Sequence, residues 1–171
     1  MDTNTQVDAV EIIEEDTKSE IELASRFKRF ISTLIDALLI TLISSAIMYF
    51  TGGFDTLAQG KEHTFFYTLL IGIGTLFIFF AINYKLLLEQ GQTLGKKILG
   101  IRIVNIDNSI ASRKQLINRY CFIFIPGYVP LIGKVFNVID MLLIFGKERR
   151  CLHDLTADTR VIKVQNNVEK I

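Results

Sequence analysis

The sequence has few of the residues that build catalytic or metal centres. Two cysteines and two histidines occur in 171 residues, and Cys121 and Cys151 are too few and too far apart for a metal-ligand set. We interpret both as small apolar side chains that stay reduced. Spacing alone indicates no Ser–His–Asp or thiol–His constellation. We therefore expect no enzyme activity, no metal and no cofactor.

Tryptophan is absent, whereas phenylalanine occurs 13 times and half of the residues are hydrophobic. Charge is almost absent from two long segments, 30–50 (FISTLIDALLITLISSAIMYF) and 64–84 (TFFYTLLIGIGTLFIFFAINY). About 20 residues at 1.5 Å each cross a hydrocarbon core of about 30 Å. We predict that both segments are transmembrane helices, so the lipid bilayer is the first expected partner.

Only two prolines occur, and both lie in PGYVP at 126–130. They interrupt a third apolar stretch, 120–145. Proline lacks an amide donor and clashes with the preceding turn, so one continuous helix is not expected there. We predict two shorter helices, about 113–126 and 130–146, joined by a turn.

Basic residues are scarce in the loop 51–63, where Lys61 is alone. They gather before the first span, between 85 and 119, and after 146. Lys and Arg favour the cytoplasmic side of a membrane. We predict a protein integral to the cell membrane with both termini and the middle loop in the cytoplasm. The hairpin at 113–146 then either reaches the outer face or dips in and returns.

The chain divides into three parts by charge and pattern. Residues 1–23 carry eight acids and one lysine, which predicts a disordered, acidic cytoplasmic tail. Residues 24–165 form the predicted membrane domain, and 166–171 a C-terminal tail. Within the domain, ILGIRIVNIDNSIAS (98–112) predicts a β-hairpin that turns at Asp107 and Asn108, and TRVIKV (159–164) has strand character. We expect one small cytoplasmic sheet that contains both.

The predicted fold class is thus all-α: a small polytopic helical bundle with two long spans, a Pro-broken helical hairpin and a small cytoplasmic β-sheet. Charged residues interrupt its apolar segments. Arg29 and Asp36 lie nearly two helical turns apart on one face, too far for mutual contact. By helix rise Asp36, Arg119 and Asp140 have similar depths, roughly 10 Å from the cytoplasmic edge.

An isolated charge in the bilayer costs several kcal/mol. We therefore expect Arg119 or Arg29 to neutralise Asp36 or Asp140, which leaves the other carboxylate as a candidate proton or cation site. The alternative is that these charges form buried pairs that only fix the helix register.

The stretch RRCLHDLTADT (149–159) places Arg150, His153 and Asp154 close together. One interpretation is a cytoplasmic gate or proton acceptor, because imidazole titrates near neutrality. The alternative is that Asp154 pairs with basic loop residues such as Arg102 or Arg113 and fixes the C-terminal segment to the membrane domain.

The stretch GQTLGKK (91–97) does not fit a phosphate-binding loop, which needs four residues between its glycines and Ser or Thr after the Lys. We expect Lys96 and Lys97 to contact lipid headgroups. No nucleic-acid partner is indicated.

Four motifs in order resemble the RDD family of membrane proteins, named for one Arg and two Asp. These are RFISTLID (29–36), GQTLGKKILGIRIVNIDN (91–108), NRY (118–120) and RRCLHDLTADTRVI (149–162). The family's Arg and first Asp correspond to Arg29 and Asp36, and its second Asp to Asp140 or Asp154. The resemblance implies a polytopic membrane domain with a transport-related role, and some members are linked to sodium/proton exchange.

Two functions follow as alternatives. In the first, the protein moves a small ion or solute, in a cation/proton exchange at Asp36 and Asp140, as a homo-oligomer if one bundle encloses too little volume. In the second, it is a scaffold or accessory subunit that binds another membrane protein through its buried charges.

Overall fold

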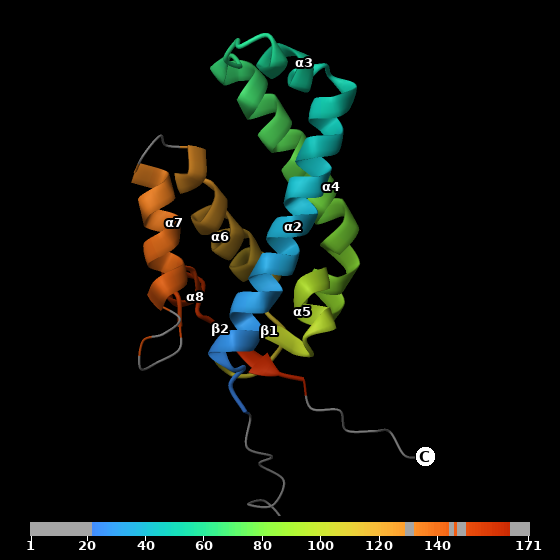
Figure 1. Ribbon diagram of the computed structural model, residues 1–171. Helices are drawn as coiled ribbons and strands as arrows, with labels where there is room; N and C mark the ends of the chain where they lie inside the picture. The colour runs from blue at the N-terminus through green and yellow to red at the C-terminus, as the bar shows by residue number, and fades with distance from the viewer. Residues whose placement is uncertain (1–21, 129–131, 144–145, 147–149, 165–171) are drawn as a thin grey trace, which may run out of the picture.

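The computed structural model describes residues 22–128, 132–143, 146 and 150–164. Its two longest helices are α2 (Arg26–Phe50) and α4 (Phe65–Gln90), which pack against each other and are joined through the short helix α3 (Gly53–Ala58) (Figure 1). They confirm the two predicted long apolar helices, each a few residues longer than predicted. The predicted tails fall almost wholly on 1–21 and 165–171, outside the described residues.

Local signals fix the ends of these helices. The Ser25 hydroxyl accepts the Lys28 amide at 3.2 Å and caps α2, as Ser commonly does at this position. Helix α4 ends at Gly91, which has a φ of +64°. A side chain there would also collide with the Ile103 carbonyl, so both backbone conformation and space require glycine.

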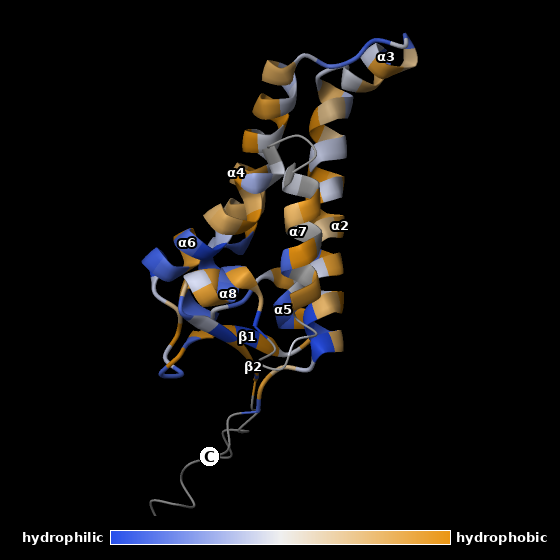
Figure 2. Cartoon of the chain, turned by 90° about the vertical axis from the view of Figure 1, so that its left-hand side faces the viewer, coloured by the Kyte–Doolittle hydropathy of each residue, from blue (hydrophilic) through white to orange (hydrophobic). Residues whose placement is uncertain are grey.

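Apolar side chains cover the outer surface of both helices. Phe50 is 84% and Phe77 75% exposed, and Figure 2 shows hydrophobic colour along much of α2 and α4. Each helix is long and apolar enough to cross a membrane. A monomeric soluble protein rarely exposes so much apolar surface, whereas such exposure is typical of membrane proteins.

A shorter helical hairpin lies beside one half of α2 (Figure 1). It consists of α6 (Arg113–Phe124), the 3₁₀ turn η1 (Pro126–Tyr128) and α7 (Ile132–Leu142). The predicted break at Pro126 is therefore confirmed. With 12 and 11 residues, α6 and α7 are about 18 and 17 Å long, and a core of about 30 Å exceeds both.

The small sheet joins the two predicted segments. Strand β1 (Ile101–Asn105) pairs antiparallel with β2 (Thr159–Lys163), and Ile101 lies opposite Lys163. The prediction of a hairpin at 98–112 was wrong in part, because the chain beyond the turn adds only a single bridge, Val104 with Ile110. The main neighbour of β1 is β2.

Two short helices complete the site region, α5 (Leu94–Ile98) and α8 (Leu152–Thr156). Helix α5 packs on α2, and α8 packs on α6 and β2. A cluster of buried apolar side chains lies beneath them, where the sheet meets α4 and α6: Ala24, Leu87, Ile101, Ile103, Ala111, Leu116, Tyr120 and Val161. This core holds the charged residues of α2, α6 and α8 in fixed positions.

Candidate functional site

Asp154 lies at the centre of the charged cluster. Its side chain is fully buried, and Arg29 from α2 and Arg119 from α6 each donate to one of its oxygens. The Cys151 amide also donates to Oδ2, at 3.2 Å. Arg119 donates further to the Thr159 hydroxyl at 3.0 Å. One carboxylate thus connects α2, α6 and the segment around α8.

Two cations around one carboxylate decide its protonation. Burial alone would raise the pKa of Asp154, but the Arg119 and Arg29 guanidiniums outweigh burial and hold this pKa well below its usual range. Asp154 is therefore ionised at physiological pH. The expected partners Arg102 and Arg113 were wrong, although the expected anchoring of this segment is present through Arg29 and Arg119.

Asp36 is held by the first turn of α5. Its Oδ1 accepts the Gly95 amide at 2.9 Å, and its Oδ2 accepts the Thr93 hydroxyl at 2.5 Å. The Lys96 ammonium lies 3.5 Å from Oδ2. Gly95 has no room for a side chain, because a Cβ would collide with the Ser32 carbonyl and the Asp36 carboxylate.

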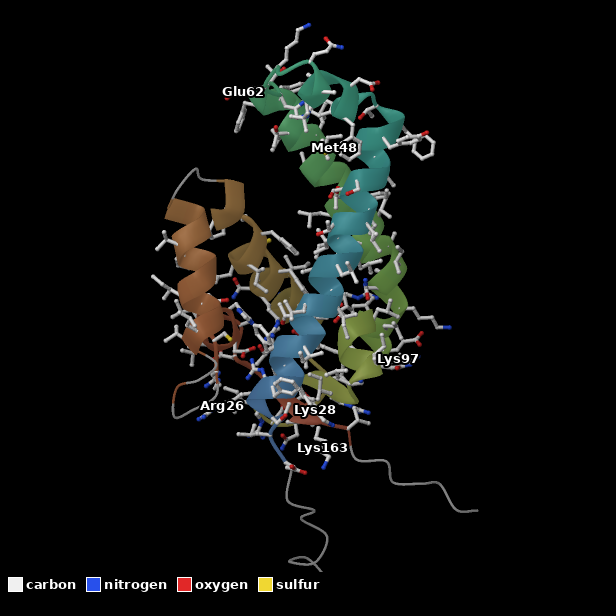
Figure 3. The ribbon with its side chains drawn as sticks, in the orientation of Figure 1. Arg26, Lys28, Met48, Glu62, Lys97 and Lys163 are labelled. Carbon is white, nitrogen blue, oxygen red and sulfur yellow. The ribbon has the colours of Figure 1, made fainter. Side chains whose placement is uncertain are left out.

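This arrangement corrects two expectations. The cation beside Asp36 is Lys96 from α5, because α5 packs on α2 at this height and α6 directs Arg119 to Asp154. Lys96 is accordingly turned inward, and its side chain is only 11% exposed, so its assignment to lipid headgroups was wrong. Lys97 is exposed and points outward in Figure 3.

Asp140 pairs with His153. The His153 amide donates to Oδ1 at 3.1 Å, and Nδ1 lies 2.5 Å from Oδ2. The expected pairing of Asp140 with an arginine is replaced by this contact. The other ring nitrogen, Nε2, lies 3.7 Å from the Asp154 carboxylate. His153 therefore stands between two acids, one on α7 and one in its own helix.

Burial lowers the pKa of His153, and the Arg119 guanidinium lowers it further, whereas the contact with Asp140 opposes the shift. A lowered pKa keeps the imidazole neutral at physiological pH. Arg150 also reaches this group and donates to the Asp154 carbonyl at 3.4 Å. The structure thus brings together Arg150, His153 and Asp154, the three residues considered as a cytoplasmic gate.

A cavity of about 260 Å³ lies between α2, α6 and α7, and both Asp36 and Asp140 line it. Lys96, Arg119 and His153 line it as well. Asp36, Arg119 and Asp140, which were predicted to share one depth, therefore do line one cavity. Tyr120 also lines it, and its hydroxyl is buried and has no hydrogen-bond partner among the described residues.

One group in this region has the composition of a metal site. Ligand atoms of Asp140, Cys151 and His153 all lie within 4.8 Å of one another. Burial raises the pKa of the Cys151 thiol to about 12, although the nearby Arg29 guanidinium opposes that shift. Because the thiolate is the form that binds metals, Cys151 is a weak ligand here. We therefore treat Asp140 and His153 as a hydrogen-bonded pair.

Sequence reasoning missed several members of the site. Thr93 and Gly95, which hold Asp36, lie in the stretch that was assigned to lipid contact. Thr93 carried a usable signal, since Ser or Thr before a short apolar run is typical of a helix N-cap, and its hydroxyl does accept the Lys96 amide. Nothing in the sequence indicated the Tyr120 hydroxyl or Cys151.

Comparison with known proteins agrees with the geometry. The sequence profile of the RDD family matches residues 23–158. The chain is also 32% identical over 147 residues to the Uncharacterized protein YxaI of Bacillus subtilis (strain 168). The aligned region covers 78% of this chain and 93% of that protein. No solved structure matches the chain significantly. Both the family profile and the relative extend over most of the chain, and the protein belongs to the RDD family.

Proposed function

We propose that this RDD protein exchanges a small cation for protons across the cell membrane, with Asp36 and Asp140 as the binding groups. The observation that carries the proposal is the cavity of about 260 Å³, which Asp36 and Asp140 line from different helices. Carboxylates within membrane segments are rare and typically belong to ion or proton pathways. The cavity is large enough for a hydrated ion or several waters.

The partners of the three buried carboxylates support different roles for them. Asp154 has two guanidiniums, which stay charged at any physiological pH, so it is a structural anion. Asp36 and Asp140 each have one titratable partner, Lys96 and His153. Burial lowers the pKa of Lys96, although Asp36 opposes the shift. When the partner of a carboxylate can itself gain or lose a proton, the pair can exchange that proton. No permanently charged group is then left without a partner.

In the proposed exchange, a cation enters the cavity, binds at Asp36 or Asp140, and displaces a proton from the Asp36–Lys96 pair or the Asp140–His153 pair. His153 accepts or returns the proton at the Asp140 end, since its Nδ1 already lies in hydrogen-bond distance of that carboxylate. The unpartnered Tyr120 hydroxyl offers a neutral oxygen ligand to the cation. Sodium and potassium accept such oxygen ligands.

The orientation that we propose places both termini and the sheet in the cytoplasm. Arg26, Lys28, Lys97 and Lys163 lie at the sheet end of the molecule, and Glu62 lies at the opposite end (Figure 3). This distribution fits the preference of basic residues for the cytoplasmic side. The cavity would then open toward the inner half of the bilayer.

The alternative function, a scaffold that binds another membrane protein through buried charges, has less support. Asp36, Asp140, Asp154 and Arg119 all have partners within the chain. A second subunit would have to break these contacts to use the charges. A scaffold role through other surfaces stays open as the outcome of a negative transport test.

The test uses purified full-length protein in liposomes that carry a pH-sensitive dye inside. Added sodium or potassium should produce proton movement in the wild type. Asp36→Asn and Asp140→Asn should each reduce the rate by about 10²-fold or more, the usual scale for losing a positioned proton-transfer group. Asp107→Asn is the matched control, because Asp107 lies in an exposed turn and should leave the rate unchanged.

Each variant must also retain the wild-type elution profile and melting temperature, so that loss of flux is not loss of fold. Wild-type protein that moves neither sodium nor potassium against protons contradicts the proposal. So does unchanged flux in both carboxylate variants.

A further inference from the structure

A second cavity, of about 440 Å³, lies between α4 and α6. Its α4 lining runs from Leu76 to Leu88, about 18 Å along the helix axis. On α6 the lining runs from Arg113 to Ile125. The surface that lines it is apolar throughout, because Arg113 and the tyrosines contribute only carbon atoms to it. We call this cavity the α4–α6 groove.

Packed aromatic rings fix the shape of the groove. The Phe80 ring centroid lies 5.1 Å from that of Tyr120 and 6.0 Å from that of Phe124, both in edge-to-face geometry. Such contacts are favourable beyond the burial of apolar area. At the rim, Ile117 is 64% exposed, so the groove opens sideways, toward lipid in a membrane protein.

A cation stands beside one end of the groove, because the Arg113 side chain lines that end with its apolar stem and the residue is exposed. Arg113 is the first residue of α6 and lies in the lining at the end near Leu88 and the sheet. The other end, near Leu76 and Phe124, has only apolar side chains. A ligand that complements this polarity has a long apolar chain and an anionic group at one end.

The length and surface of the groove suit an extended acyl chain. The groove runs about 18 Å along α4, and the surface that lines it is apolar throughout. Acyl chains are the apolar molecules that surround a membrane protein on the side to which the groove opens.

We propose that the α4–α6 groove binds one anionic phospholipid, with an acyl chain along the aromatic rings and the phosphate at Arg113. A guanidinium is suited to this contact, because its planar donors match phosphate oxygens. The site is separate from the proposed exchange, since neither Asp36 nor Asp140 lines the groove. Each proposal can therefore fail while the other holds.

The absence of tryptophan allows a direct test, because Ile117→Trp gives the chain a single indole at the groove rim. This variant is placed in equimolar phosphatidylglycerol and phosphatidylcholine, with brominated acyl chains on one lipid at a time. Bromine quenches only neighbouring indole. Phe77→Trp is the control reporter, since Phe77 is 75% exposed on α4 and lies outside the groove lining.

We expect about fivefold preference for the anionic lipid at Ile117→Trp, the effect of one basic residue on an anionic lipid, and no preference at Phe77→Trp. Adding Arg113→Gln to the Ile117→Trp variant should remove the preference without changing the melting temperature. Equal quenching by both lipids at the groove overturns the proposal. So does a preference that persists in Arg113→Gln, which would mean that general basic charge attracts the lipid.

Discussion

At the scale of single residues, the number of cationic partners separates the three buried carboxylates. Asp154 is fully buried and accepts from two arginines, whereas Asp36 and Asp140 have one titratable partner each. Removing one member of a buried ion network costs more than the network contributes, because the remaining charges lose their compensation without regaining water. Asp154 should therefore matter most for stability, and Asp36 and Asp140 for activity.

Asp154→Asn should lower the free energy of unfolding by about 3–5 kcal/mol, because it leaves Arg29 and Arg119 buried beside a neutral amide. Thermal unfolding of the full chain in detergent micelles measures the loss. Asp158→Asn is the control, since Asp158 is exposed and has a φ of +50°, which Asn also tolerates. Equal melting temperatures for the two variants would show that Asp154 is not the centre of the cluster.

At the scale of elements, helix α5 is held against α2 by a close backbone approach at Gly95. A Cβ there would meet the Ser32 carbonyl, part of the α2 backbone, which cannot turn aside as a side chain can. The same approach places the Gly95 amide 2.9 Å from Asp36. The position of α5 and the hydrogen bonds of Asp36 therefore both depend on glycine at position 95.

Gly95→Ala should cost about 1–3 kcal/mol, the usual effect of forcing an extra methyl group into a packed interface, and should also reduce any cation-driven proton flux. Gly74→Ala is the control, because its Cβ would meet only the Ile47 side chain at an ordinary 3.7 Å. Melting temperature and liposome flux are measured on both variants. A Gly95→Ala protein as stable as Gly74→Ala would mean that α5 can move away from α2 at little cost.

The elements were more predictable from sequence than their contacts. Apolar length and the prolines at 126 and 130 were enough to predict α2, α4 and the broken hairpin, because both signals are local. The alternation of Ile101 and Ile103 correctly predicted β1, and both side chains are fully buried. The partner of each buried carboxylate was not predictable. Helix rise gives the depth of a residue in the membrane, but it does not give how each helix is rotated toward its neighbours, and several cations lie at similar depth.

Cys121 and Cys151 illustrate the same limit. Their spacing along the chain argued against a metal-ligand set, yet it could not show that Cys151 lies beside His153 and Asp140. Asp36 was recognised as a buried acid from its apolar surroundings. Its partners came from α5, a five-residue helix that is too short to have a clear periodic pattern.

At the scale of the whole molecule, the two long helices and the helices of the short hairpin differ in length relative to the thickness of a bilayer. The 25 and 26 residues of α2 and α4 give about 38 and 39 Å, enough to cross a bilayer, whereas α6 gives about 18 Å. The turn Pro126–Tyr128 therefore lies at middle depth if the sheet end stands at one membrane surface. This geometry favours a hairpin that enters and returns on the same side.

Tyr128→Cys, in a chain that also carries Cys121→Ala, should not react with a membrane-impermeant maleimide added on the side of the loop 51–63. Lys61→Cys, in that loop, should react from this side, and Lys163→Cys, in β2, only from the other. The extent of labelling is measured on intact and inverted vesicles. Reaction of Tyr128→Cys from the side of Lys61→Cys would establish a complete crossing.

The Asp154 cluster also fixes the order in which the molecule can be completed. Asp154 is 125 residues later in the chain than Arg29 and 35 later than Arg119. During synthesis both arginines are therefore made before their shared carboxylate. The cluster therefore cannot be complete until α8 has been synthesised, so the bundle reaches its final electrostatic balance only near the end of translation.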